Sequence, residues 1–218
     1  MDKNIKLNTD VKRRAAEFYG LANETLQDLN GFSNFVFSGE KDGEKTIIRI
    51  TPVSHRTVDL TLGELEFLQY LSNCGIPVSI PLLSIKGELV EVVDDFVITS
   101  FEMMPGRRAE IAIESDIFYE RLGSFTGQMH RMSLNYKPVH KRKHWNLDNA
   151  LTVLKKYTPP DLHVKFDAIA NEINALPREQ GSYGLIHGDL SLGNYLNYED
   201  HPQIIDFDMC EYFDFSAI

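Results

Sequence analysis

Two short stretches, HGDLSLGN at residues 187–194 and IIDFD at residues 204–208, decide the fold assignment. The segment between them holds two apolar-rich runs separated by EDHP at residues 199–202. Such runs on either side of a polar turn predict a β-hairpin. With those four residues as its turn, Tyr198 pairs with Gln203.

This hairpin brings three oxygen-bearing side chains close together. In the register just given, Asn194 lies opposite Phe207 and beside Asp206. A carboxylate and an amide oxygen presented together are hard ligands of the kind that magnesium prefers. Asp189, on the loop that enters the hairpin, is placed to orient the proton of an alcohol. Taken singly these residues are typical of turns and caps, so it is their joint spacing that predicts a site.

The pattern His-Gly-Asp-x-x-x-x-Asn followed by Ile-Asp-Phe-Asp resembles the signature of the aminoglycoside phosphotransferase family, which includes choline-kinase-like enzymes. That family is similar in fold to the protein kinases. The resemblance covers residues 30–208. It implies that Asp189 is the catalytic base and that Asn194 and Asp206 hold the magnesium ions that bridge the ATP phosphates.

Two neighbouring residues take their interpretation from the same resemblance. Asp208 stands where protein kinases carry glycine, and aspartate is usual there in the resembled family. His187 is expected to be structural, bonding backbone groups around the loop, because a carboxylate is the family's acceptor of the alcohol proton.

The resemblance extends more weakly into the N-terminal part. Residues 30–34, which include Gly31 and Ser33, stand where a loop covers the nucleotide, although one glycine replaces the usual three. Arg49 occupies the place of the phosphate-binding lysine. Arginine keeps the charge but differs in geometry. Glu64 matches the glutamate that pairs with this cation; the alternative for Glu64 is an exposed helix face.

Residues 101–104 are interpreted as the segment that joins the two lobes. The resemblance implies that the backbone here, at Glu102 and Met104, binds the adenine edge. Methionines at these positions are equally typical of a plain core.

The order of the other elements predicts an α+β, two-lobe, protein-kinase-like fold with a β-rich N-lobe and a mainly helical C-lobe. The expected N-lobe, residues 1–104, has a helix from Thr9 or Asp10 to Gly20. A hairpin turning at Asp42-Gly43 follows, with Val36 opposite Arg49. The remaining elements are a helix through residues 58–71 and strands at residues 88–93 and 96–101.

The expected C-lobe, residues 105–218, begins after Met104-Pro105-Gly106. Apolar residues at helical spacing predict helices through residues 118–132 and 162–176, the second ended by Pro177. The basic stretch 137–144 between them is expected to be a solvated loop. Short strands are predicted at residues 184–187 and 203–207.

Composition narrows the classes of function. The 218 residues are 43% hydrophobic and 25% charged, with a formal net charge of −10. An acidic surface disfavours nucleic acid and anionic membranes and suits cationic small molecules. The two cysteines, Cys74 and Cys210, lack metal-site spacing, and no apolar run is long enough to cross a bilayer. A cytoplasmic location is expected.

The function predicted from these observations is transfer of the γ-phosphoryl group of ATP, or of GTP, to a hydroxyl of a small molecule with Mg²⁺ as cofactor. An aminoglycoside or an amino alcohol is the expected acceptor. A protein kinase is one alternative, although no Ala-Pro-Glu segment follows Asp206 and little room remains for an activation loop. The others are a non-catalytic nucleotide-binding protein and a metal-dependent hydrolase using Asp189, Asp206 and Asp208.

The last residues are rich in apolar side chains: Cys210, Tyr212, Phe213, Phe215 and Ile218. Members of the resembled family continue into helices that wall the acceptor pocket. We therefore expect a shortened chain with an incomplete acceptor site, which binds nucleotide but transfers poorly or forms a homo-oligomer through this tail. The competing expectation is that the tail packs on the chain's own helices.

Overall fold

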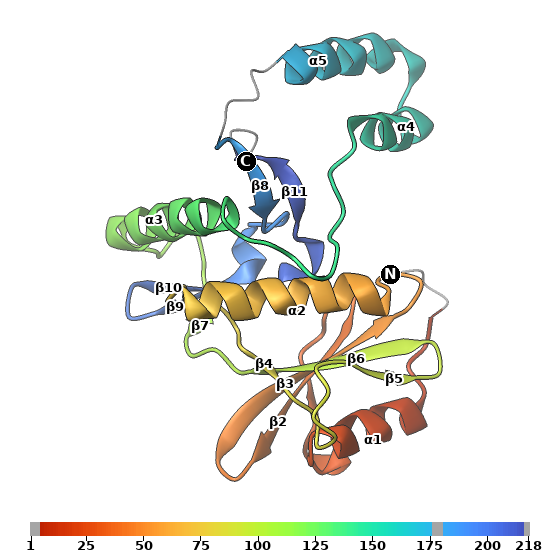
Figure 1. Cartoon of the computed structure of the whole chain (residues 1–218), viewed down its shortest axis with the longest axis vertical. Coiled ribbons are helices and arrows are strands. Elements are labelled where there is room, and N and C mark those ends of the chain that lie inside the picture. Colours follow the sequence, from red (N-terminus) through yellow and green to blue (C-terminus); the bar gives the residue numbers. More distant parts are fainter. Residues whose placement is uncertain (1–4, 176–180, 216–218) are drawn as a thin grey trace.

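A six-stranded antiparallel sheet fills most of the N-terminal half, and the C-terminal half is mainly helical (Figure 1). The computed structural model describes residues 5–175 and 181–215. The main strands of the sheet run in the order β1-β2-β3-β6-β4, with β5 also paired to β6. Their bounds are β1 Gln27–Asp28, β2 Phe35–Lys41, β3 Glu44–Pro52, β4 Pro81–Leu82, β5 Glu91–Val93 and β6 Phe96–Glu102.

The β2–β3 hairpin has the predicted register. Asp42 and Gly43 form its two-residue turn, and both have positive φ values, 54° and 84°. A turn of this hand matches the natural twist of the two strands. Val36 is therefore paired with Arg49, as the sequence predicted.

Helices cover the sheet on both faces. α1, Thr9–Phe18, is capped by Asn8 rather than by Thr9 or Asp10, and it buries Val11, Ala15 and Ala16 in a core shared with β3. α2, Val58–Asn73, is capped by Thr57 and belongs to a second core that reaches into the C-terminal half. Figure 1 shows α2 lying between the large sheet and the strands Tyr183–Ile186 and Glu211–Asp214 of the C-terminal half. This helix therefore joins the two halves of the molecule through its buried apolar side chains.

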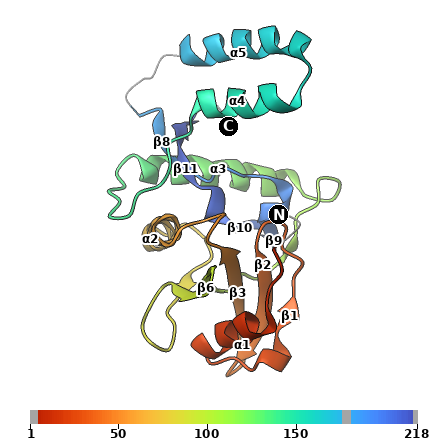
Figure 2. The ribbon, with the colours of Figure 1, turned by 90° about the vertical axis from the view of Figure 1, so that its right-hand side faces the viewer.

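The C-terminal half holds three longer helices and two small sheets. The helices are α3 Asp116–Ser133, α4 Leu147–Tyr157 and α5 His163–Ala175. One sheet has the order β10-β9-β7 and the other pairs β11 with β8. The strands are β7 Arg107–Arg108, β8 Tyr183–Ile186, β9 Tyr195–Tyr198, β10 His201–Ile204 and β11 Glu211–Asp214. Short 3-10 turns are η2 Pro160–Leu162, η3 Leu192–Asn194 and η4 Phe207–Met209 in this half, and η1 Asn23–Thr25 in the N-terminal half. Figure 2 shows α4 and α5 side by side, farthest from the large sheet.

The turn of the β9–β10 hairpin differs from the prediction. It has two residues, Glu199 and Asp200, both with positive φ, so Tyr198 pairs with His201 and not with Gln203. Asn194 consequently meets Ile205, whose N–H donates to the Asn194 carbonyl at 3.0 Å. The error is two residues, and because side chains alternate along a strand, each residue keeps its predicted face.

One helix of the C-terminal half was missed, and the prediction for the basic stretch holds except at one residue. The helix α4 was not predicted, although Asn146 caps it through the N–H of Asn149. The basic loop 137–144 is exposed at most positions, but Arg142 is buried. Pro177, the predicted end of the last helix, lies outside the described residues.

The segment 210–215 packs against its own chain. β11 pairs with β8, Cys210 is part of the core shared with α2, and the Phe213 ring lies 4.4 Å from the ring of Trp145. The Phe215 ring stacks on His130 of α3 at a centroid distance of 4.4 Å. Contact with α3 agrees with the competing expectation for the tail. Self-association through the tail stays a prediction, and Ile218 lies outside the described residues.

The α+β class is confirmed, whereas a boundary between the lobes at residue 104 stays a prediction. Within residues 5–175 and 181–215, no helix is both long and apolar enough to span a bilayer.

Candidate active site

The loop that carries Asp189 is fixed by His187. The ring of this buried histidine donates from Nε2 to the Ile205 carbonyl at 3.0 Å and accepts at Nδ1 from the Asp189 N–H at 3.2 Å. Burial lowers the pKa of His187 to about 4, so the ring is neutral at pH 7. Because the Asp189 N–H can only donate, Nδ1 is the acceptor and Nε2 carries the proton. The predicted backbone bonding of His187 is present.

Gly188 allows the loop to approach the next segment closely. Its φ is +81°, and a Cβ here would collide with the Met209 carbonyl oxygen. Only glycine accepts both conditions without strain. The loop bearing Asp189 is thereby held directly against η4.

Asp189 and Asn194 contact each other. The Asn194 amide nitrogen donates to the Asp189 carbonyl at 2.8 Å and to its carboxylate at 3.1 Å. Asn194 sits at the end of η3, where the chain turns into β9. Because the amide nitrogen faces Asp189, the amide oxygen remains as the acceptor that a cation could use.

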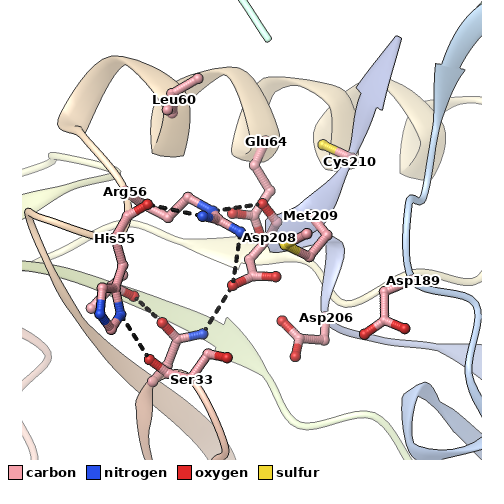
Figure 3. Close-up of polar contacts among 12 residues, drawn as sticks. Ser33, His55, Arg56, Leu60, Glu64, Asp189, Asp206, Asp208, Met209 and Cys210 are labelled. Carbon is pink, nitrogen blue, oxygen red and sulfur yellow. Dashed lines mark hydrogen bonds and ion pairs between the residues drawn. The ribbon is translucent and has the colours of Figure 1, made fainter. Parts of the chain in front are cut away.

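Asp206 adopts left-handed backbone angles, with φ 64° and ψ 66°, immediately before η4. Its side chain is 44% exposed, and its carboxylate lies 3.6 Å from a guanidinium nitrogen of Arg49. Partial burial, followed by repulsion from Asp208, raises the pKa of Asp206 to about 6, while Arg49 acts in the opposite direction. Figure 3 shows the Asp189 and Asp206 carboxylates next to each other.

Arg49 and Glu64 form a buried two-point ion pair between β3 and α2. The nitrogen–oxygen distances are 2.8 and 2.7 Å, and the side chains are 7% and 2% exposed. Burial alone would lower the pKa of Arg49, but Glu64 and the nearby aspartates leave it raised. The predicted pairing is present, and the exposed-face alternative for Glu64 is wrong.

Asp208 turns away from the open side of the site. Its carboxylate accepts from the amide of buried Asn34 at 3.1 Å and lies 3.8 Å from Arg56 (Figure 3). Sequence reasoning missed both partners, and it also missed Arg142, which donates to the Asp208 carbonyl at 2.6 Å. Single polar residues in loops carry no local signal for such contacts.

The remaining candidate residues lie in two places. Gly31 and Ser33 are in the loop that leads to Asn34, and the Ser33 carbonyl is 3.3 Å from Nδ1 of His55. Glu102 ends β6, where its N–H donates to Ile80 and its carbonyl accepts from Ser79. Met104 follows β6, and within the described ranges its N–H has no hydrogen-bond partner. Within the described ranges, no hydrogen bond or ion pair joins the Glu102 end of β6 to the Asp189, Asp206 or Asp208 carboxylates.

The side-chain oxygens of Asn194 and Asp206 suit a divalent cation that takes its remaining ligands from phosphate and water. Asn194 and Asp206 offer one amide and one carboxylate oxygen, and the described residues hold no cluster of three or more His, Cys, Asp or Glu side chains placed as metal ligands. Magnesium commonly keeps few protein ligands and completes its shell with phosphate and water oxygens. Burial, followed by repulsion from neighbouring carboxylates, raises the pKa of Asp206, and a bound cation would counteract both by stabilising the charged form. The Arg49 Nε is also buried without a partner in the described ranges.

A sheet with a buried Arg–Glu pair, followed by helices and a hairpin presenting Asp189, Asn194 and Asp206, defines a protein-kinase-like fold. The chain matches the phosphotransferase enzyme family, denoted APH, over residues 25–217. It is 35% identical over 217 residues to amicoumacin kinase of Bacillus subtilis (strain 168), covering 94% of this chain. The chain therefore belongs to this phosphotransferase family.

Solved structures agree with this assignment. A structure described as amicoumacin kinase hAmiN in complex with AMP-PNP, Ca²⁺ and Ami superposes with a TM-score of 0.90 at 30% identity, covering 99% of this chain and 69% of that chain. A microcompartment-associated aminopropanol kinase gives a TM-score of 0.77 at 22% identity, covering 95% of this chain and 71% of that one. At that identity the second match supports the fold alone. The chain spans 64% of the length of the Bacillus subtilis kinase.

Proposed function

We propose that this protein transfers the γ-phosphoryl group of ATP to a hydroxyl of a small molecule. The observation that carries the proposal is the meeting of Asp189, Asn194 and Asp206 beside the Arg49–Glu64 pair. The similarity to a kinase solved with AMP-PNP and Ca²⁺ supports a nucleotide and a divalent cation as cofactors. A cytoplasmic location belongs to the same proposal, since ATP is the donor.

In this proposal Asp189 orients the acceptor hydroxyl and takes its proton as the hydroxyl oxygen bonds to the γ-phosphorus and the bond from that phosphorus to the leaving ADP breaks. Asn194 holds the Asp189 carboxylate from one side and offers its amide oxygen to the metal, together with Asp206. Magnesium bound there would offset the negative charge that spreads over the transferred group. Arg49, fixed by Glu64, adds positive charge on the sheet side.

The nucleotide would lie between an N-lobe of residues 1–104 and a C-lobe of residues 105–218. Residues 30–34, with Gly31 and Ser33, would cover the phosphates. The Glu102 carbonyl and the free Met104 N–H are suited to the adenine edge, since a carbonyl that already accepts one hydrogen bond retains a second lone pair.

The acceptor is proposed to enter on the C-lobe side of Asp189. A cavity of about 240 Å³ is lined by Gly188 and Leu190, the two neighbours of Asp189, and by Trp145, Glu211 and Phe213. It combines aromatic rings with a carboxylate, which suits an amino alcohol or part of an aminoglycoside. A homo-oligomer formed through the tail is compatible with this proposal, because a second copy could extend the cavity.

An ADP-release screen tests the proposal. Purified protein is incubated with ATP or GTP, Mg²⁺ and acceptors that include amicoumacin, aminopropanol, spectinomycin, choline, homoserine and simple sugars. Acceptor-dependent ADP formation with a phosphorylated product in the mass spectrum supports it. A thermal shift with ATP and Mg²⁺ but no ADP from any acceptor would instead favour a non-catalytic nucleotide-binding protein.

A further inference from the structure

Asp208 is held from several directions by residues outside its own segment. Its side chain, 10% exposed, accepts from the Asn34 amide nitrogen at 3.1 Å and faces a guanidinium nitrogen of Arg56 at 3.8 Å. Its backbone carbonyl accepts from Arg56 Nε at 3.0 Å and from Arg142 at 2.6 Å. Both side-chain contacts reach the same carboxylate oxygen, and the other two hold the backbone carbonyl, so Asp208 is fixed in place by protein partners at both its side chain and its main chain.

Asn34 carries the contact into the sheet. It is 4% exposed and ends the loop 30–34, directly before β2. Its amide oxygen accepts from the Thr51 hydroxyl on β3 at 2.9 Å, so its amide nitrogen is turned toward Asp208. One side chain thus ties the end of this loop both to β3 and to the segment 206–209.

Arg56 provides a second connection from the N-terminal half. It lies between β3 and α2, and besides Asp208 it donates to the His55 carbonyl at 2.9 Å. His55 in turn lies 3.3 Å from the Ser33 carbonyl, in the same loop as Asn34 (Figure 3). Asp208 therefore reaches the loop 30–34 by two routes, through Asn34 directly and through Arg56 and His55.

We propose that Asp208 is a positioning residue that couples the loop 30–34 to the segment 206–209, so that the ordering of either one orders the other. The inference follows from the side chains that join these segments 174 positions apart in the chain. Its consequence, that phosphate-loop closure and metal binding by Asp206 are linked, relies on the proposed function. The coupling itself belongs to the nucleotide-free protein.

Hydrogen exchange of the nucleotide-free protein tests the coupling. We expect Asp208→Ala to raise amide exchange at least about tenfold in residues 30–37, far along the chain from the substitution. Asn34→Ala should do the same in residues 205–210. The effects in the double variant should be less than additive, because the contact between Asn34 and Asp208 is lost only once.

The matched control is Glu91, a buried carboxylate of β5 that accepts from Ser84 at 2.8 Å and pairs with Lys86 at 3.3 Å. Glu91→Ala should lower the melting temperature and loosen residues 84–91 while leaving 30–37 and 205–210 unchanged. Additive single effects, or changes confined to the substituted segment, would overturn the proposal. Asp208→Asn, which keeps an acceptor oxygen for Asn34, should give an intermediate exchange rate and serves if the alanine variant fails to fold.

Nucleotide binding provides a second readout, with a fluorescent ATP analogue titrated with and without Mg²⁺. Coupling predicts that both variants weaken binding, Asn34→Ala by on the order of tenfold and Asp208→Ala by at least as much, because it also loses the contact with Arg56. If Asp208 ligated the metal directly, Asp208→Ala would abolish only the Mg²⁺-dependent part and Asn34→Ala would not reproduce it, which would refute the positioning role. Absence of nucleotide binding by the wild type would count against the proposed function, while the exchange experiment still decides the coupling.

Discussion

The guanidinium of Arg49 and the carboxylate of Glu64 form a two-point ion pair between β3 and α2, with distances of 2.8 and 2.7 Å. Val36 lies opposite Arg49 across the hairpin, and the register set by the Asp42-Gly43 turn aims this arginine at the helix. A turn of two residues thereby fixes the position of the strongest charge pair in the candidate site.

Replacing Arg49 by Met should destabilise the protein by about 3–5 kcal/mol, because it leaves the Glu64 carboxylate buried without its cation. Urea unfolding measures the change. The double variant Arg49→Met with Glu64→Met should recover most of the loss, since neither member of the pair is then left as an unpaired buried charge. Arg13→Ala is the control: Arg13 pairs with Asp10 and Glu17 on an exposed face, so little change is expected. Wild-type stability of Arg49→Met alone would contradict this prediction.

Variants of Asp189 and Asp206 should separate nucleotide binding from phosphoryl transfer. Asp189→Ala should lower turnover by on the order of 10²-fold or more, with nucleotide binding nearly intact. Asp206→Ala should lose Mg²⁺-dependent nucleotide binding as well. Calorimetry with ATP and Mg²⁺, beside the ADP assay, measures both quantities, and the exposed Asp161→Ala serves as control. Turnover above about a tenth of wild type in Asp189→Ala would show that this carboxylate is not the base.

The site was largely readable from sequence because its residues are close along the chain. Asp189, Asn194 and Asp206 sit on one loop and one hairpin, and the misplaced turn moved pairings by two residues without exchanging faces. The turn itself was misread because Glu199 and Asp200 adopt positive φ without glycine. Asp200 is helped by Asn197, whose side chain accepts from its N–H at 2.8 Å.

The parts that could not be predicted depend on contacts between distant segments. Asn34 and Asp208 are 174 residues apart, and nothing in either local sequence indicates that they meet. Arg142 lies in a run of basic residues, which usually faces water. The missed helix α4 is a different case, because Asn146 ahead of Leu147, Leu151 and Leu154 is a recognisable start followed by helical spacing.

The free energy of unfolding should decrease as the pH is lowered from 7 to 4, because His187 is buried in its neutral form. Burial lowers its pKa to about 4, while the unfolded chain has the ordinary value of 6.5. Between these values the unfolded state binds a proton that the folded state does not, so stability rises with pH across this window and is lost as pH falls. The full effect is about 3 kcal/mol. Urea midpoints from pH 4 to pH 7 should show a shallower slope in His187→Gln, and an unchanged slope would contradict the assignment.

Two glycines should respond to alanine in opposite directions. Gly188→Ala places a Cβ against the Met209 carbonyl at positive φ, so a loss of at least about 1–3 kcal/mol is expected. Gly123 is an exposed position within α3 with open space around its Cβ site, so Gly123→Ala should stabilise by up to about 1 kcal/mol. Thermal melts of both variants make the comparison. Equal effects would mean that the contact between Gly188 and Met209 does not constrain the loop.

Arg142 should prove essential to the fold although its neighbours are dispensable. Its guanidinium donates to three carbonyls, those of Leu60 at 2.5 Å, Asp208 at 2.6 Å and Cys210 at 2.7 Å. It therefore ties α2 to the segment that follows Asp206. Arg142→Met keeps much of the apolar stem but leaves these carbonyls short of donors, and a loss of about 2–5 kcal/mol is expected.

The matched control is Lys141→Met, one position earlier in the same basic run and exposed to solvent, for which unfolding midpoints should stay near wild type. Arg142→Lys separates charge from geometry, because a lysine ammonium cannot reach three diverging carbonyls at once and should recover only part of the loss. Urea unfolding of the three variants decides the question. If Arg142→Met unfolded at the same midpoint as Lys141→Met, the three carbonyl contacts would contribute nothing to stability, which would contradict the prediction.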